Sequence, residues 1–105
     1  MELGTASGGG NSALGYRALR NVTTGASNIA IGNTAADSIT TGSYNVAMGE
    51  NAYGVGNGSS NVAIGWRSQL NATGNNNVAL GRDTLYNVTS NEKVDVGNGA
   101  MRACT

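Results

Sequence analysis

Asn61-Val62-Ala63-Ile64-Gly65 is the stretch of this 105-residue chain that decides the fold, because it recurs along the whole sequence. Clear copies begin at residues 11, 28, 45 and 77, and a degenerate copy, Lys93-Val94-Asp95-Val96-Gly97, begins at residue 93. The six starts are 17, 17, 16, 16 and 16 residues apart. Self-similarity at a fixed short period is typical of proteins that stack one structural unit on the next. We therefore expect a solenoid.

Each period also holds a second apolar segment and two polar segments. Ala18–Thr23 is such a second segment, and Thr24–Ser27 is a polar segment of the kind that forms turns. Two strands of about five residues and two turns would fill one period. We predict an all-β chain, a parallel β-roll or β-solenoid of about six coils of 16–17 residues. Residues 1–10 are expected to be a lead-in and residues 11–105 the repeat domain, with coils starting near 11, 28, 45, 61, 77 and 93.

Alternation within the motif assigns its side chains to two faces. Val62 and Ile64 point one way in a strand, and Ala63 points the other way. We expect the large aliphatic side chains to fill the interior and the small Ala face to be covered by a neighbouring chain. The alternative is that Ala only satisfies a tight bend in a monomer. The second segments should bury one further column, formed by Val22, Ile39, Val55, Ala72, Val88 and Cys104.

Asn opens five copies of the motif, and Gly closes all six. Stacked coils would place the Asn side chains in a ladder in which each amide bonds the next, or Asn merely tolerates the bend before the strand. The Gly residues are predicted to form turns that need an unusual backbone conformation. The ladder comprises Asn11, Asn28, Asn45, Asn61 and Asn77, and the turn glycines are Gly15, Gly32, Gly49, Gly65, Gly81 and Gly97.

The composition argues against catalysis and against several partners. The chain has no His and one Cys, so neither a Ser-His-Asp triad nor a Cys/His zinc site can form, and its six carboxylates occupy unrelated slots of the repeat. We predict no catalytic residue, no metal site, no cofactor and no enzyme activity. The net charge is zero without a basic run, and no apolar stretch is long enough to cross a membrane. Nucleic acid and membrane insertion are therefore not expected, and the start of the chain has no signal-peptide pattern.

Two exposed features are candidates for recognition or modification. Tyr16 and Trp66 follow the motif Gly, where the other coils carry polar residues, so Trp66 beside Arg67 could contact a sugar or a protein. The alternative is ordinary cover of the roll or a contact between copies. The glycosylation acceptor pattern is matched at Asn21, Asn57, Asn71 and Asn87, which is equally explained by the preference of the fold for Asn and Thr.

The Asn-x-Ala-(Ile/Leu/Met)-Gly copies resemble the head repeats of trimeric autotransporter adhesins. The longer phrase from Asn11 to Gly25 is similar to repeats of bacteriophage tail-fibre proteins. The period here is slightly longer than is usual in the autotransporter heads. The resemblance implies left-handed parallel β-rolls that associate as a homotrimer, in a fibre on a virion tail or an extracellular cell surface.

The expected function is a stiff trimeric shaft or head that serves host or surface attachment. Its expected partners are copies of itself and a host-surface glycan or protein. A filament subunit that stacks end to end is the main alternative. A weaker alternative is an ice- or surface-binding solenoid, which would use the single column of Thr23, Thr40, Thr73, Thr89 and Thr105.

Overall fold

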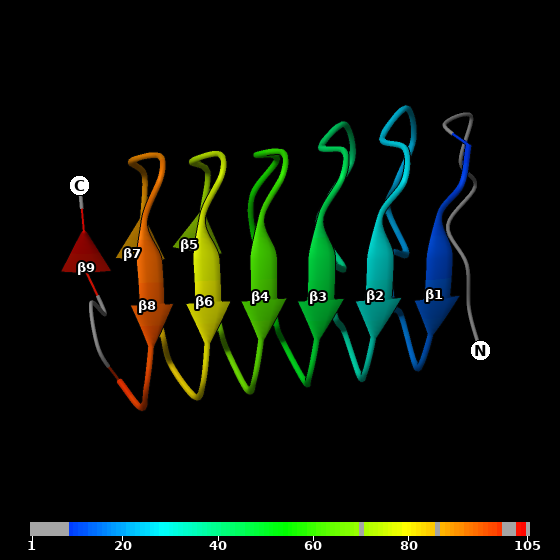
Figure 1. Ribbon diagram of the computed structural model, residues 1–105. Coiled ribbons are helices and arrows are strands. Elements are labelled where there is room, and N and C mark those ends of the chain that lie inside the picture. Colours follow the sequence, from blue (N-terminus) through cyan, green and yellow to red (C-terminus); the bar gives the residue numbers. More distant parts are fainter. Residues whose placement is uncertain (1–8, 70, 86, 100–102, 105) are drawn as a thin grey trace.

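The fold is a parallel β-solenoid, as the repeat predicts (Figure 1). It has about five turns, whereas we expected about six coils. It is seen in a computed structural model that describes residues 9–69, 71–85, 87–99 and 103–104. The molecule is elongated, with extents of 33 × 22 × 15 Å. The predicted lead-in lies mostly outside the described residues.

One six-stranded sheet runs the length of the molecule, and each motif copy contributes one strand. Its strands pair in parallel and in strict register, so that Val46 lies beside Val62 and Val62 beside Val78. Each strand has three residues, fewer than the five predicted. In sheet order they are β1 (Ser12–Leu14), β2 (Ile29–Ile31), β3 (Val46–Met48), β4 (Val62–Ile64), β6 (Val78–Leu80) and β8 (Val94–Val96).

The second segment of each period forms a strand only in the later coils. There β5 (Asn71–Ala72), β7 (Asn87–Val88) and β9 (Ala103–Cys104) make a three-stranded sheet. In the first two coils the expected second strand is replaced by turns. Leu19 and Ala36 both have a φ of 52°, a left-handed conformation that interrupts a strand. Hydrogen bonds still join these coils, for example from Leu19 N to Ala35 O at 3.0 Å.

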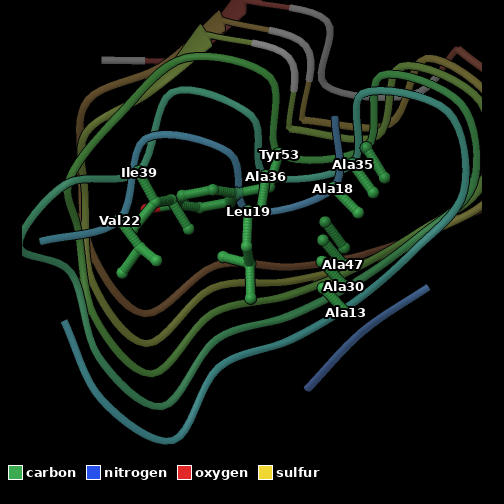
Figure 2. Close-up of a cluster of buried hydrophobic side chains, with 12 residues drawn as sticks. Ala13, Ala18, Leu19, Val22, Ala30, Ala35, Ala36, Ile39, Ala47 and Tyr53 are labelled. Carbon is green, nitrogen blue, oxygen red and sulfur yellow. The ribbon is translucent and has the colours of Figure 1, made fainter. Parts of the chain in front are cut away.

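The interior is lined by the Ala of the first five motif copies and by the buried Asp95 of the sixth, which reverses our assignment of the two faces. Ala30, Ala47 and Ala63 are fully buried, whereas Ile64 is 37% exposed on the outside. Figure 2 shows Ala13, Ala30 and Ala47 pointing into the same interior as Leu19. The interior of the coil is narrow and also holds large side chains, such as Leu19, from the segment opposite the strand. There is room for them only because the strand contributes a methyl group. The predictions that the aliphatic side chains of the motif fill the interior and that a neighbouring chain covers the Ala face were therefore wrong.

The third coil departs from the others because Tyr53 occupies its interior. The Tyr53 side chain is fully buried, and its hydroxyl donates to Gly58 O at 3.0 Å and accepts from Asn61 Nδ2 at 3.1 Å. Gly56 is buried nearby, and Val55 is 53% exposed. The expected burial of Val55 was wrong. The structure does not describe the side chains of three other members of this predicted column, Ala72, Val88 and Cys104.

Candidate interaction face

The outer surface of the six-stranded sheet carries two columns of aliphatic side chains. We call these two columns the apolar face. All their members are described, and none is charged. Exposure of the aliphatic members that are exposed ranges from 37% at Ile64 to 67% at Val96, and Val46, Val62, Val78 and Leu80 are half-buried. The first column is Ser12, Ile29, Val46, Val62, Val78 and Val94, and the second is Leu14, Ile31, Met48, Ile64, Leu80 and Val96.

The apolar face is a direct consequence of the inward Ala. Side chains alternate along a strand, so when Ala63 points inward, Val62 and Ile64 must point outward. The in-register pairing then repeats this choice every ~4.8 Å along the molecule. A contiguous apolar surface of this kind is unusual on a protein that works alone, and it marks sites of protein association.

The motif glycines form the boundary of the apolar face at the end of each strand. All six have φ values between 124° and 136°, a region that favours Gly. They also stack directly on one another: a Cβ placed on Gly65 would lie 2.5 Å from Gly81 O. The glycines therefore allow the sharp turn and the close approach of successive coils.

The motif asparagines line the opposite boundary, where each strand begins. Asn61 is fully buried; its Oδ1 accepts the backbone N–H of Asn77 at 2.9 Å, and its Nδ2 donates to Gly74 O at 3.0 Å. Asn28 and Asn45 make the equivalent two bonds. The column thus joins coils mainly through side-chain bonds to backbone. A direct bond between amides links Asn28 Nδ2 to Asn11 Oδ1 at 3.2 Å.

The aromatic candidates lie just beyond the glycine boundary, each against an arginine. Tyr16 is 56% exposed, with the Arg17 guanidinium carbon 4.8 Å from the ring centroid. Trp66 is 37% exposed, with the guanidinium carbons of Arg67 and Arg82 at 4.1 and 4.8 Å.

Asp83 holds the two arginines beside Trp66. The distances are 2.9 Å from Arg67 Nε to Asp83 Oδ1 and 3.4 Å from Arg82 Nε to Asp83 Oδ2. Our sequence reasoning missed Arg82 and Asp83. The period contained the signal, since Arg82 follows Trp66 by 16 residues and therefore stacks next to it.

The glycosylation-pattern asparagines lie elsewhere. Asn21, Asn57 and Asn87 are exposed, and the Asn71 side chain is not among those described. Asn21 Nδ2 donates to Asp37 O at 2.8 Å, and Asn57 Oδ1 accepts from Thr40 N at 2.7 Å. At these two positions the amide joins successive coils.

The described part of the chain offers little chemistry beyond these contacts. Burial raises the pKa of Tyr53 to about 12, which keeps its hydroxyl protonated as a hydrogen-bond donor. In the described ranges, no three His, Cys, Asp or Glu side chains gather where they could hold a metal ion. Nor do those ranges contain a helix long and apolar enough to span a bilayer.

Comparisons with known proteins found no match to this chain among protein-family models, curated proteins or solved structures. The apolar face and its two boundaries are therefore the observations from which a function can be inferred.

Proposed function

We propose that this chain is a non-enzymatic structural segment of an extracellular fibre, of the kind found in phage tail fibres and microbial surface adhesins. Three left-handed rolls would pack side by side through their apolar faces as a homotrimer and so form a stiff shaft or head for attachment. The trimeric state and the handedness follow the resemblance of the repeats. The observation that carries the association is the apolar face.

Copies of this chain are the occupants that fit the face best. Packing two such faces desolvates no charge, because neither column contains a charged side chain. Both surfaces repeat at the same strand spacing, so ridges on one copy match those on the next. Completing the burial of a half-exposed aliphatic side chain contributes roughly 1 kcal/mol. Over two columns this amounts to on the order of 10 kcal/mol per chain, comparable to the folding free energy of a small domain.

The coil-to-coil bonds explain how such a segment could bear load. Successive coils are joined by the sheet, by the Asn column, and by turn bonds such as Ser43 N to Ser59 Oγ at 3.1 Å. Pulling along the rod would therefore load several hydrogen bonds in every coil together. Tyr16 and Trp66 with Arg67 would lie at the rim of the packed faces, where the part that a neighbouring copy does not cover would contact a host-surface glycan or protein.

Sedimentation equilibrium of the wild type and two charge insertions tests this proposal. The wild type should have three times the chain mass, and Ile64→Glu should dissociate it by placing a charge in the centre of the face. Thr73→Glu, at an exposed position outside the face, is the matched control and should stay trimeric. Circular dichroism checks that both variants fold. A wild type that remains monomeric at high concentration, or an Ile64→Glu variant that associates normally, would contradict the proposal.

The same experiment distinguishes the end-to-end filament. The outer strands of the six-stranded sheet are β1 and β8, and an open edge can pair with another chain. Such stacking would give a mass that keeps rising with concentration, and Ile64→Glu would leave it unchanged.

A further inference from the structure

Two rows of exposed residues flank the apolar face, and all their members are described. The exit edge consists of the residues that follow the motif Gly: Tyr16, Asn33, Glu50, Trp66, Arg82 and Asn98. The entry edge consists of the residues that precede the first position of each motif copy: Gly10, Ser27, Tyr44, Ser60, Asn76 and Glu92. In Figure 1 the exit edge lies below the arrowheads and the entry edge lies above the strands.

The charges on the two edges differ. Glu50 and Arg82 are the charged members of the exit edge, and Glu92 is the charged member of the entry edge. The Arg82 side chain is 61% exposed although its Nε contacts Asp83. Lys93, beside Glu92, directs its Nζ to Asn91 O at 3.4 Å. The exit edge thus carries one exposed arginine and one exposed glutamate, and the entry edge carries an exposed glutamate.

Arg82 and Glu92 cannot meet within one molecule. Arg82 lies beyond the end of its strand and Glu92 lies before the start of its own. Across the sheet, about five residues of extended chain separate the entry edge from the exit edge, which corresponds to roughly 15 Å. Along the rod, however, they differ by only one strand spacing of ~4.8 Å, because β6 and β8 are neighbours in the sheet.

Symmetry brings the two edges together when copies pack with their rods parallel. In any closed ring of copies around an axis parallel to the rod, the exit edge of one copy faces the entry edge of the next. An antiparallel pair would instead place like edges together, so that Arg82 of each copy would face Glu50 of the other. The proposed homotrimer excludes that arrangement, because three copies around one axis all run in the same direction.

We propose that the copies lie parallel, with Arg82 of each copy paired to Glu92 of the neighbouring copy. In a closed ring of parallel copies the coils lie level, so Arg82 faces Asn76 of the neighbouring copy, and Glu92 lies one strand spacing of ~4.8 Å further along the rod, a distance that the long arginine side chain spans. Glu50 faces Tyr44 and Ser60 at the corresponding two positions, so no like charges meet. This inference rests on the proposed association through the apolar face and adds to it a charge pair between parallel copies.

A double-mutant cycle tests the pairing. Arg82→Glu and Glu92→Arg should each weaken association on the order of tenfold, because each places like charges together at every interface. The double variant should recover most of the wild-type affinity. Glu50→Arg reverses a charge on the same edge, where the parallel ring places it against the uncharged Tyr44 and Ser60, and it should change the affinity less than about threefold. Sedimentation equilibrium gives the affinities, and circular dichroism checks folding.

The outcomes separate this inference from the proposed function. A monomeric wild type overturns both. A wild type that associates, with single variants that weaken it and a double variant that shows no recovery, overturns only the pairing of Arg82 with Glu92.

Cross-linking gives a second test that does not depend on affinities. Arg82→Cys and Glu92→Cys are combined in a Cys104→Ser background, the associated protein is oxidised, and the linked peptides are identified by mass spectrometry. A disulfide between positions 82 and 92 supports the parallel arrangement, because the two positions are too far apart within one chain. Links of 82 to 82 or of 92 to 92, or no link in the associated protein, would overturn it.

Discussion

The two walls of each coil differ in how strictly the sequence repeats. The strand wall, by which we mean the residues of the motif, has Asn, an inward Ala and Gly at the same positions in each of the first five coils. The opposite wall places residues of very different size at equivalent positions, namely Leu19, Ala36, Tyr53, Gln69 and Leu85, all of them buried. The strand wall must satisfy hydrogen bonds and close backbone contacts that are the same in every coil. The opposite wall only has to fill space, so a small residue in one coil is compensated by a large one in the next.

Gln69 illustrates the tolerance of the opposite wall. It is fully buried, and its Nε2 donates to Val62 O at 2.7 Å. Its Oε1 is buried without a hydrogen-bond partner among the described residues. An unpaired polar atom of this kind costs about 1–3 kcal/mol, and the wall accommodates it. Substitutions in the strand wall should therefore cost more than substitutions in the opposite wall.

The largest loss is expected for Gly65→Ala in the strand wall. The new Cβ would lie 2.5 Å from Gly81 O, at a φ of 125°. We expect the free energy of unfolding to fall by about 4 kcal/mol or more, measured by urea denaturation. Gly99→Ala is the matched control, because it also has positive φ but nothing within 4 Å of the new Cβ. An equal loss in both variants would show that conformation alone, without the close stacking, sets the cost.

The next largest loss is expected for Asn61→Ala. The substitution leaves Asn77 N and Gly74 O without their partner in a buried site. We expect a loss of about 3 kcal/mol in the same denaturation assay. Asn33→Ala, at an exposed position, should change stability by less than about 0.5 kcal/mol. If the two substitutions had similar effects, the Asn column would not be holding the coils together.

A smaller loss is expected for Tyr53→Phe in the opposite wall. The variant loses the bonds to Gly58 O and Asn61 Nδ2, which should lower stability by about 1–2 kcal/mol. Tyr44→Phe, at a side chain that is 67% exposed, should be nearly neutral.

The Tyr53 hydroxyl should also make the protein sensitive to alkali. Its pKa is raised from 10.0 to about 12 by burial, so the unfolded chain loses the proton first and stability falls as the pH rises from 10 to 12. The stabilisation that the buried hydroxyl contributes is fully present below pH 10, and it amounts to about 1–3 kcal/mol of unfolding free energy. Thermal melts of the wild type and Tyr53→Phe at pH 9 and 11.5 measure it. Equal alkaline losses in both proteins would contradict it.

A small gain is expected for Ser60→Gly at the entry edge. Ser60 is exposed with a φ of 60°, and a left-handed conformation costs a non-glycine residue about 1 kcal/mol. The variant should gain about 0.5 kcal/mol in denaturation, after the extra freedom of Gly in the unfolded chain is counted. Ser38→Gly, outside the positive-φ positions, should lose stability instead. A loss in both variants would show that the turn is not strained at Ser60.

The period was sufficient to predict the architecture, and it failed where the decision depends on the width of the coil. Val46, Val62 and Val78 stack as the spacing predicts. Alternation alone could not show which face of the strand points inward, because Ala and Val are both apolar. The width of the coil decides which face of the strand points inward. That width depends on turns at residues such as Leu19, whose left-handed conformation has no sequence signature.

The candidate site was only half visible in the sequence for a related reason. Trp66 and Arg67 are adjacent in the chain and were identified. Arg82 and Asp83 join them through the stacking of coils, and a column-by-column alignment would have found them. Val55 was misplaced because the ring of Tyr53 fills the interior of its coil.

Thiol labelling of the two faces of β4 tests the central claim most directly. Ala63→Cys and Ile64→Cys are each made in a Cys104→Ser background and treated with a maleimide over a range of protein concentrations. Ala63 is fully buried and Ile64 is 37% exposed. The Ile64→Cys variant should react rapidly when dilute and slow down as copies associate, whereas the Ala63→Cys variant should stay protected at every concentration. Rapid labelling of the Ala63→Cys variant together with protection of the Ile64→Cys variant in dilute solution would contradict the account.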